Sequence, residues 1–311
     1  MKYPFPAVID SSMLGTLKSC QQKFYKQYIA EWKAKGLSVH LHAGKSFATG
    51  LERARRSFYE EDSTADTAIA DGARALMSAY GTFECPADSA KSLERVLGAF
   101  EYYWNHYPLG QSESQPIVMP NGRRGIEFTF AHPLPILHPE TGDPLIYSGA
   151  MDAIYNHAGD IYIIDEKTTT QLGATWARQW DLRAQFTGYA WGCREAGIRV
   201  AGAIVRGVSI LKTKYETQEA LTYRPEWAVQ RWYNEMLCLV NRAIEMWRRD
   251  EWIHDLDGAC AEYGGCAFRQ CCASQDETPW LETYFERRHW DPVKREETLL
   301  ETPDASIPSP G

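Results

Sequence analysis

Several features are missing from this sequence of 311 residues, and each absence excludes a class of protein. No stretch approaches the ~20 consecutive apolar residues that a membrane-spanning helix needs. The opening residues, MKYPFPAVIDSS, lack the apolar core of a signal peptide, so we expect a cytoplasmic protein. With 44% apolar and 24% charged residues, the chain is not collagen-like, low-complexity or wholly disordered.

An excess of positive charge is also missing, because the formal net charge is −8. This balance argues against a protein that coats nucleic acid by bulk electrostatics, but it allows a local basic surface. Residues 1–60 carry ten Lys or Arg against four Asp or Glu, and the balance reverses after residue 275. The N-terminal part is the better candidate for binding a polyanion, with an ordinary solvated helix face as the alternative.

The pattern of apolar residues predicts one α/β domain with helical additions at both ends. We expect a single domain over residues 1–290, with a helical part at 36–110, a core at 120–225 and a disordered tail at 291–311. Predicted helices cover 11–31, 44–60, 64–80, 88–107, 174–196 and 225–252. Predicted strands cover 125–131, 145–155, 161–168, 199–211 and 215–223.

The most informative stretch is 147–170, YSGAMDAIYNHAGDIYIIDEKTTT, which predicts two strands joined by a tight turn. If His157 and Ala158 form a two-residue turn, position 152 lies opposite 163 and position 150 lies opposite 165. This register decides which side chains share a face, because a shift of one residue moves every side chain to the other face.

In that register Asp152, Asp165 and Lys167 share one face of the sheet, and Glu166 points to the other. Burying two carboxylates and a lysine without a partner is costly. Asp152 and Asp165, with the backbone carbonyl of Glu166, would hold Mg²⁺ or Mn²⁺ and leave positions for a phosphate and a water. Lys167 would orient or deprotonate that water. The alternative is an ordinary hairpin whose charges lie in solvent.

The run Gly149-x-x-Asp152, followed by Asp165-x-Lys167-Thr168, resembles the core of the PD-(D/E)XK nuclease superfamily, and within it the RecB-like exonuclease branch. The resemblance implies a central mixed sheet flanked by helices, as in restriction endonucleases. It also implies a deoxyribonuclease that depends on Mg²⁺ or Mn²⁺.

A second motif extends this resemblance along the chain. Gln185-Phe-Thr-Gly-Tyr189 is similar to the Q-x-x-x-Y helix that lies beside the active site in the RecB-like branch. Gln185 and Tyr189 are one helical turn apart and therefore face the same way. The resemblance implies that both residues contact DNA.

One position departs from the family pattern. In the family a Gly-x-x-x-His step on an N-terminal helix supplies a histidine to the metal site. Here the fourth residue after Gly44, where the histidine would stand, is Ala48. Glu52 lies one turn further on the same face and could supply a carboxylate instead, or could simply pair with Arg55 or Arg56. Glu127, on the preceding strand, is another candidate acid.

Four of the eight cysteines lie in a short C-terminal window, and a fifth, Cys20, lies on the first predicted helix. One early cysteine with a C-terminal trio resembles the iron–sulfur-bearing RecB-like and CRISPR-associated exonucleases. That resemblance implies a 4Fe–4S cluster that joins residues 1–35 to residues 255–290. The implied ligands are Cys20, Cys260, Cys266 and Cys272, with Cys271 as the alternative to Cys272. Zinc or plain reduced thiols are the other interpretations.

The leading hypothesis is therefore a metal-dependent DNA exonuclease that acts on DNA ends or single strands in recombination, repair or CRISPR adaptation. The sequence contains no GxxxxGK[ST] motif, which excludes a built-in helicase. A non-catalytic DNA-binding protein that retains the fold and cluster is the alternative, motivated by Ala48. A third possibility is an α/β protein with structural zinc and no role with nucleic acid. The resemblance implies DNA as the partner and identifies no partner protein.

Overall fold

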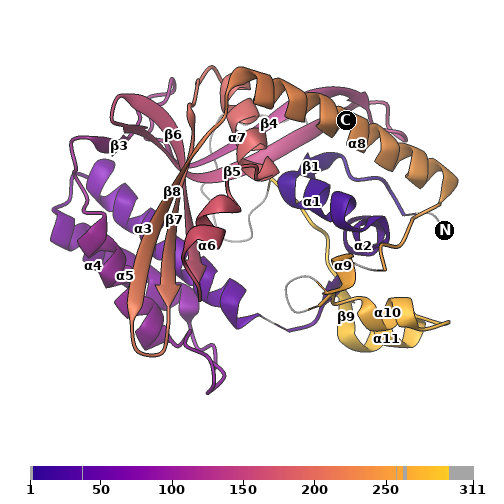
Figure 1. The fold of residues 1–311 in the computed structure, drawn as a ribbon, viewed down its shortest axis with the longest axis horizontal. Coiled ribbons are helices and arrows are strands. Elements are labelled where there is room, and N and C mark those ends of the chain that lie inside the picture. Colours follow the sequence, from indigo (N-terminus) through magenta and orange to yellow (C-terminus); the bar gives the residue numbers. More distant parts are fainter. Residues whose placement is uncertain (1–2, 37, 257, 262–264, 294–311) are drawn as a thin grey trace.

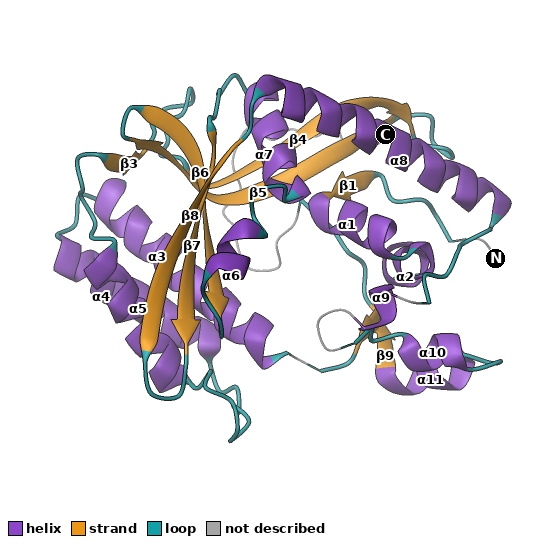
Figure 2. Cartoon of the chain, viewed as in Figure 1, coloured by secondary structure: helices purple, strands orange, loops and turns teal. Residues whose placement is uncertain are grey.

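The computed structural model describes residues 3–36, 38–256, 258–261 and 265–293, and a seven-stranded mixed sheet forms its centre (Figures 1 and 2). The strands run in the order β1, β5, β6, β7, β8, and β3 and β4 both pair with β5. The pairs β1–β5 and β6–β7 are parallel. The strands are β1 (Val8–Asp10), β3 (Ser114–Pro116), β4 (Ile126–Leu137), β5 (Pro144–His157), β6 (Asp160–Thr169), β7 (Gly202–Ile210) and β8 (Tyr215–Tyr223).

Helices pack on both faces of the sheet. One apolar cluster joins α3 (Val39–Tyr59), α4 (Ala65–Tyr80) and α5 (Leu93–His106) to Val208 and Ile210 of β7. A larger cluster joins α1 (Ser11–Ser19), α7 (Ala184–Glu195) and α8 (Glu226–Arg249) to Ala203 and Val205 of the same strand. Because successive strand residues point to opposite faces, the two groups of helices cover opposite faces of β7.

Local sequence explains where these helices lie. The buried residues of α8 recur every three to four positions, which gives the helix one apolar stripe against the sheet. Asp10 is the N-cap of α1, because its carboxylate accepts a hydrogen bond from the Met13 N–H at 2.7 Å.

The hairpin of β5 and β6 forms as predicted, but the predicted turn residues were wrong. His157 pairs with Asp160, so Ala158 and Gly159 form the turn, both with positive φ. Position 163 consequently lies opposite Ile154 rather than residue 152. This shift is two residues, an even number, so the predicted sharing of faces is unaffected.

The edge of β5 that carries this hairpin is forked, because two different strands, β1 and β6, pair with successive parts of it. β4 occupies the other edge, since Ser148 and Ala153 both pair with it. On the forked edge β1 pairs with β5 as far as Ser148, and β6 pairs with it from Ala153 onward. Residues 149–152 lie between the two partners, and Asp152 is the last of them. We call this segment and the facing part of β6 the fork.

The two ends of the described chain meet at one side of the molecule (Figure 1). The short strands β2 (Trp32–Ala34) and β9 (Phe285–Arg287) form an antiparallel pair. A small cluster that includes Phe268, Cys271 and Leu281 packs against Trp32. The remaining elements there are α2 (Gln21–Phe24), a π-helical turn η1 (Tyr25–Ile29), α9 (Gly258–Ala261), α10 (Arg269–Ala273) and α11 (Thr278–Tyr284).

Several predicted elements need correction. The helix predicted over 11–31 is interrupted at Cys20, whose backbone is extended, and then changes into the π-helical turn. The helix predicted over 174–196 is two helices, α6 (Ala174–Arg178) and α7. The four short strands β1, β2, β3 and β9 were not predicted, and β3 lies between the helix predicted over 88–107 and the strand predicted over 125–131. Most of the predicted tail, residues 294–311, lies outside the described residues.

Candidate active site

Asp152 and Asp165 meet at the fork. Asp152 Oδ2 accepts a hydrogen bond from the Glu166 N–H at 3.1 Å, just beyond the point where the β5–β6 pairing ends. In an extended strand the N–H and C=O of one residue point to the same edge, so the Glu166 carbonyl also points into the fork. Asp165 is only 3% exposed.

Lys167 lies beside these two aspartates. Its Nζ lies 2.6 Å from Asp165 Oδ2, and its side chain is 36% exposed. That carboxylate oxygen is buried and makes no hydrogen bond of good geometry despite the short ion pair. The site is therefore closed on the side of Asp165 and open on the side of Lys167.

Burial and neighbouring charges both act on the ionisable groups of the fork. Burial raises the pKa of Asp165 to about 7, the Lys167 ammonium opposes this, and the Asp152 carboxylate raises it further. Burial alone would lower the pKa of Lys167, but Asp165 and Asp152 together raise it above its ordinary value. Two carboxylates face one ammonium, so a further cation would relieve the repulsion between them.

Gln185 and Tyr189 form a hydrogen-bonded pair on α7. Gln185 Nε2 donates to Tyr189 Oη at 2.9 Å, as their spacing of one turn allows. A Cβ atom at Gly149 would lie 2.9 Å from the Tyr189 ring and 2.7 Å from the Phe130 ring. The glycine that begins the Gly149-x-x-Asp152 motif is therefore needed for the close approach of α7 to β5.

The side chain of Glu166 points to the opposite face, as predicted. Arg55 Nη1 donates to its Oε2 at 3.2 Å, and Tyr103 Oη donates to its Oε1 at 2.8 Å. Burial would raise the pKa of Glu166, but the Arg55 guanidinium outweighs it and holds the pKa low. This buried ion pair fixes the middle residue of the Asp-Glu-Lys run to α3 and α5.

The other acids considered from the sequence lie as follows. Glu52 accepts a hydrogen bond from Arg56 Nε at 2.9 Å, which is the pairing offered as the alternative to a metal ligand. Glu127 lies in β4 between two residues that pair with Ala153 and Met151, which places it across from Asp152. Its φ of 50° is unusual for a residue other than glycine and is often found at functional sites.

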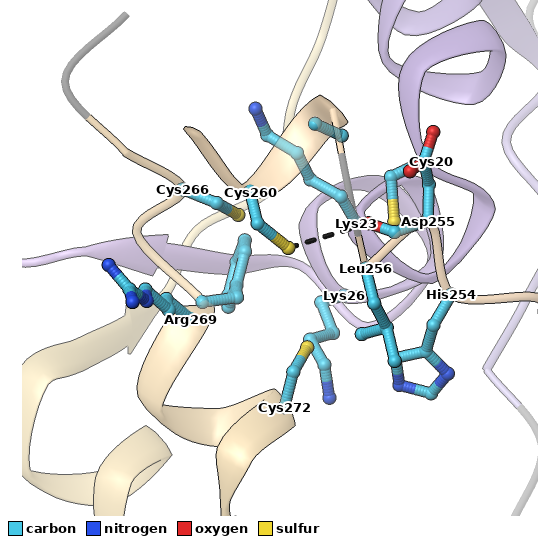
Figure 3. A pocket seen from close by; sticks show the side chains of 12 residues that line it. Cys20, Lys23, Lys26, His254, Asp255, Leu256, Cys260, Cys266, Arg269 and Cys272 are labelled. Carbon is cyan, nitrogen blue, oxygen red and sulfur yellow. Dashed lines mark hydrogen bonds between the residues drawn. The ribbon is translucent and has the colours of Figure 1, made fainter. Parts of the chain in front are cut away.

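The four predicted cysteine ligands line one pocket between α2, α9 and α10. Their thiols point toward a common space, with Lys23, Lys26, Asp255 and Arg269 around them (Figure 3). Cys271 does not line this pocket and is instead buried beside Phe268 and Leu281. The pocket-lining cysteines are Cys20, Cys260, Cys266 and Cys272.

The thiols of this cysteine pocket influence one another. Burial raises the pKa of Cys272 to about 11; Lys26 lowers it, and Cys266, Cys20 and Cys260 each raise it further. Burial also raises the pKa of Cys260, with Cys266 and Cys20 adding to the effect. A group that binds all four as thiolates must therefore compensate their mutual repulsion.

The side chains present can be compared with the groups they would hold. Among the described residues, no three His, Cys, Asp or Glu side chains gather closely enough to hold a single ion by themselves. At the fork two carboxylates and a carbonyl suit Mg²⁺ or Mn²⁺, which take oxygen ligands and, for Mg²⁺, retain several waters. At the cysteine pocket four thiols line one space, a ligand set that either a structural zinc ion or an iron–sulfur cluster can use.

A mixed sheet with helices on both faces defines an α/β protein, and at the fork two of its carboxylates lie beside a lysine. A sequence profile of the PD-(D/E)XK nuclease superfamily matches residues 11–273, nearly the whole described chain. The chain therefore belongs to the PD-(D/E)XK nuclease superfamily. Nucleases of this superfamily act on nucleic acids and generally use divalent metal ions.

Solved structures give weaker likenesses. A candidate exonuclease from Eubacterium rectale is 13% identical with a TM-score of 0.48, over 84% of this chain and 89% of that chain. The protein SSO0001 is 13% identical with a TM-score of 0.28, over 73% of this chain and 84% of that chain. No curated protein matches the sequence.

Within the described part of the chain, no helix combines the length and the apolar character needed to cross a membrane.

Proposed function

We propose that this chain is a metal-dependent DNA exonuclease whose active site is the fork. The observation that carries the proposal is the meeting of Asp152, Asp165 and Lys167 there, in a chain of the PD-(D/E)XK superfamily. The preference for DNA ends or single strands rests on the RecB-like motifs, in particular Gln185 and Tyr189.

Each residue of the fork has a distinct role in this proposal. Asp152, Asp165 and the Glu166 carbonyl would hold a divalent ion, which when bound would lower the pKa of a water and offset charge on the scissile phosphate. Lys167, on the open side of the site, would donate a hydrogen bond to the phosphate or to the attacking water. Gln185 and Tyr189 would hold the DNA backbone beside these groups.

The cysteine pocket would hold a 4Fe–4S cluster that joins residues 1–35 to residues 255–290. The convergence of four thiols on one pocket supports this assignment, and Cys272 is favoured over Cys271 because only Cys272 lines the pocket. An iron–sulfur cluster accepts four thiolates without a fixed sequence spacing. The cluster would have a structural role, because the fork lies elsewhere in the fold.

The proposal is tested with end-labelled linear single-stranded and double-stranded DNA in Mg²⁺ or Mn²⁺, with circular single-stranded DNA as the matched substrate. We expect nucleotides to be released from linear DNA, no release in EDTA, and survival of the circle. Equal cleavage of circular and linear DNA would show that the enzyme is an endonuclease and not an exonuclease. Binding of DNA without cleavage in either metal would favour the non-catalytic DNA-binding protein, which the alanine at position 48 motivates.

A further inference from the structure

A buried lysine lies in the wall of the cysteine pocket. Lys26 belongs to the π-helical turn η1, and only 1% of it is exposed. Turns of this kind are rare and are often found at functional sites. A buried ammonium group is strongly destabilising unless it is paired. Lys26 Nζ is paired with the Glu277 carboxylate, from the other end of the chain.

This ion pair is asymmetric. The Glu277 side chain is 39% exposed, so water screens its charge, whereas the Lys26 ammonium is enclosed. The other cations that line the pocket are less enclosed, since Lys23 is partly exposed and Arg269 is exposed. Lys26 is therefore the positive charge that acts on the thiols through the least solvent.

We propose that Lys26 tunes the cysteine pocket electrostatically: its enclosed ammonium offsets the charge of the four thiolates and raises the reduction potential of the group they hold. This inference rests on the cluster proposed above and concerns no residue of the fork. Reduction of the cluster adds one electron, so the reduced form carries one more negative charge than the oxidised form. A fixed positive charge in a poorly solvated site stabilises the more negative form.

The test is the midpoint potential of the cluster in anaerobically purified full-length protein, followed by its visible absorbance during a dithionite titration with redox mediators. Lys26→Met removes the positive charge and retains a similar shape, so the potential should become more negative. Glu277→Gln removes the screened negative charge and leaves Lys26 in place, so the potential should become more positive. Lys23→Met is the matched control in the same pocket and should cause a smaller shift than Lys26→Met.

The opposite signs separate an electrostatic role from a structural one. If the substitutions acted by loosening the packing around the pocket, the midpoint potentials of Lys26→Met and Glu277→Gln would shift in the same direction. That result would overturn the proposal. Unchanged potentials in both variants would also overturn it. If Lys26→Met fails to retain iron, the midpoint potential of Glu277→Gln decides the question. A more positive potential supports the proposal, and any other result overturns it. Parental protein without iron and sulfide would overturn the cluster together with this role for Lys26, while cleavage of DNA by the fork would be unaffected.

Discussion

The fork and the cysteine pocket are assembled in different ways. The fork uses residues from one hairpin and the next long helix, and backbone pairing of β5 and β6 sets its geometry. The pocket joins Cys20 to three cysteines near the other end of the chain, and contacts such as Lys26–Glu277 and β2–β9 hold it together. We therefore expect changes at the fork to alter the rate of hydrolysis, and changes at the pocket to alter cofactor content and stability.

Among substitutions that leave the proposed metal ligands in place, the largest effect should come from Lys167→Met at the fork. Loss of a positioned proton donor or acceptor typically costs about 10²–10⁴ in rate. The variant should still bind Mn²⁺ by calorimetry, because an ammonium group is not a metal ligand. Lys212→Met, on the exposed connection between β7 and β8, is the matched control and should cleave DNA like the parental protein. A parental rate for Lys167→Met would exclude Lys167 from the chemistry.

The next effect concerns the stability of the fork. Arg55→Met removes the guanidinium that pairs directly with buried Glu166, which should lower the free energy of unfolding by about 3–5 kcal/mol. Arg53→Met on the same helix breaks one exposed and one partly exposed ion pair and should cost less than about 1 kcal/mol. Denaturant unfolding of the two variants measures this difference. Equal losses would mean that the Arg55–Glu166 pair has no special part in holding β6.

The cysteine pocket should respond without a change in the catalytic residues. Cys20→Ser should lose iron and sulfide, melt at a lower temperature and bind DNA more weakly, because a hydroxyl is a poor substitute for a thiolate ligand. Cys238→Ser, exposed on α8, should change none of these properties. Elemental analysis and visible absorbance provide the measurement.

The same measurement decides between the adjacent cysteines. Cys272→Ser should lose the cluster, whereas Cys271→Ser should retain it, because only Cys272 lines the pocket. Retention of iron by Cys272→Ser with loss by Cys271→Ser would reverse the ligand assignment.

The smallest effect should come from Tyr189→Phe. This change removes the hydroxyl that accepts a hydrogen bond from Gln185 at 2.9 Å, which is worth roughly 0.5–1.5 kcal/mol. We expect the affinity for DNA to fall by up to about tenfold, with little change in Mn²⁺ binding. Titration of fluorescent single-stranded DNA measures the affinity, and Tyr102→Phe on α5 is the control. Equal affinities of the two variants for DNA would mean that the hydrogen bond between Gln185 and Tyr189 has no part in DNA binding.

The sharing of a face by Asp152, Asp165 and Lys167 could be predicted from the sequence, because side chains alternate with a period of two along a strand. The predicted turn was one residue too early, which made the register between β5 and β6 wrong by two residues. Because two is an even number, each side chain still lies on its predicted face. The fork itself could not be predicted, since β1 has three residues and pairs with a strand far along the chain. Such short strands carry too little pattern to identify.

The surroundings of the cysteines were less predictable. Their number and order suggested a shared site, but the choice between Cys271 and Cys272 depends on how α10 packs against Phe268 and Leu281. The burial of Lys26 depends on Glu277, a contact between distant parts of the chain that no local pattern encodes. The break at Cys20 and the π-helical turn also run against the continuous helical pattern of that segment.

The most direct test of the central claim compares Asp165→Ala with Asp160→Ala, an exposed aspartate on the same strand. Both are assayed on end-labelled linear DNA with Mn²⁺, and circular dichroism checks that both are folded. The account predicts that Asp165→Ala releases no nucleotides and binds Mn²⁺ more weakly, while Asp160→Ala behaves like the parental protein. Cleavage by folded Asp165→Ala at the parental rate would contradict the assignment of the active site to the fork.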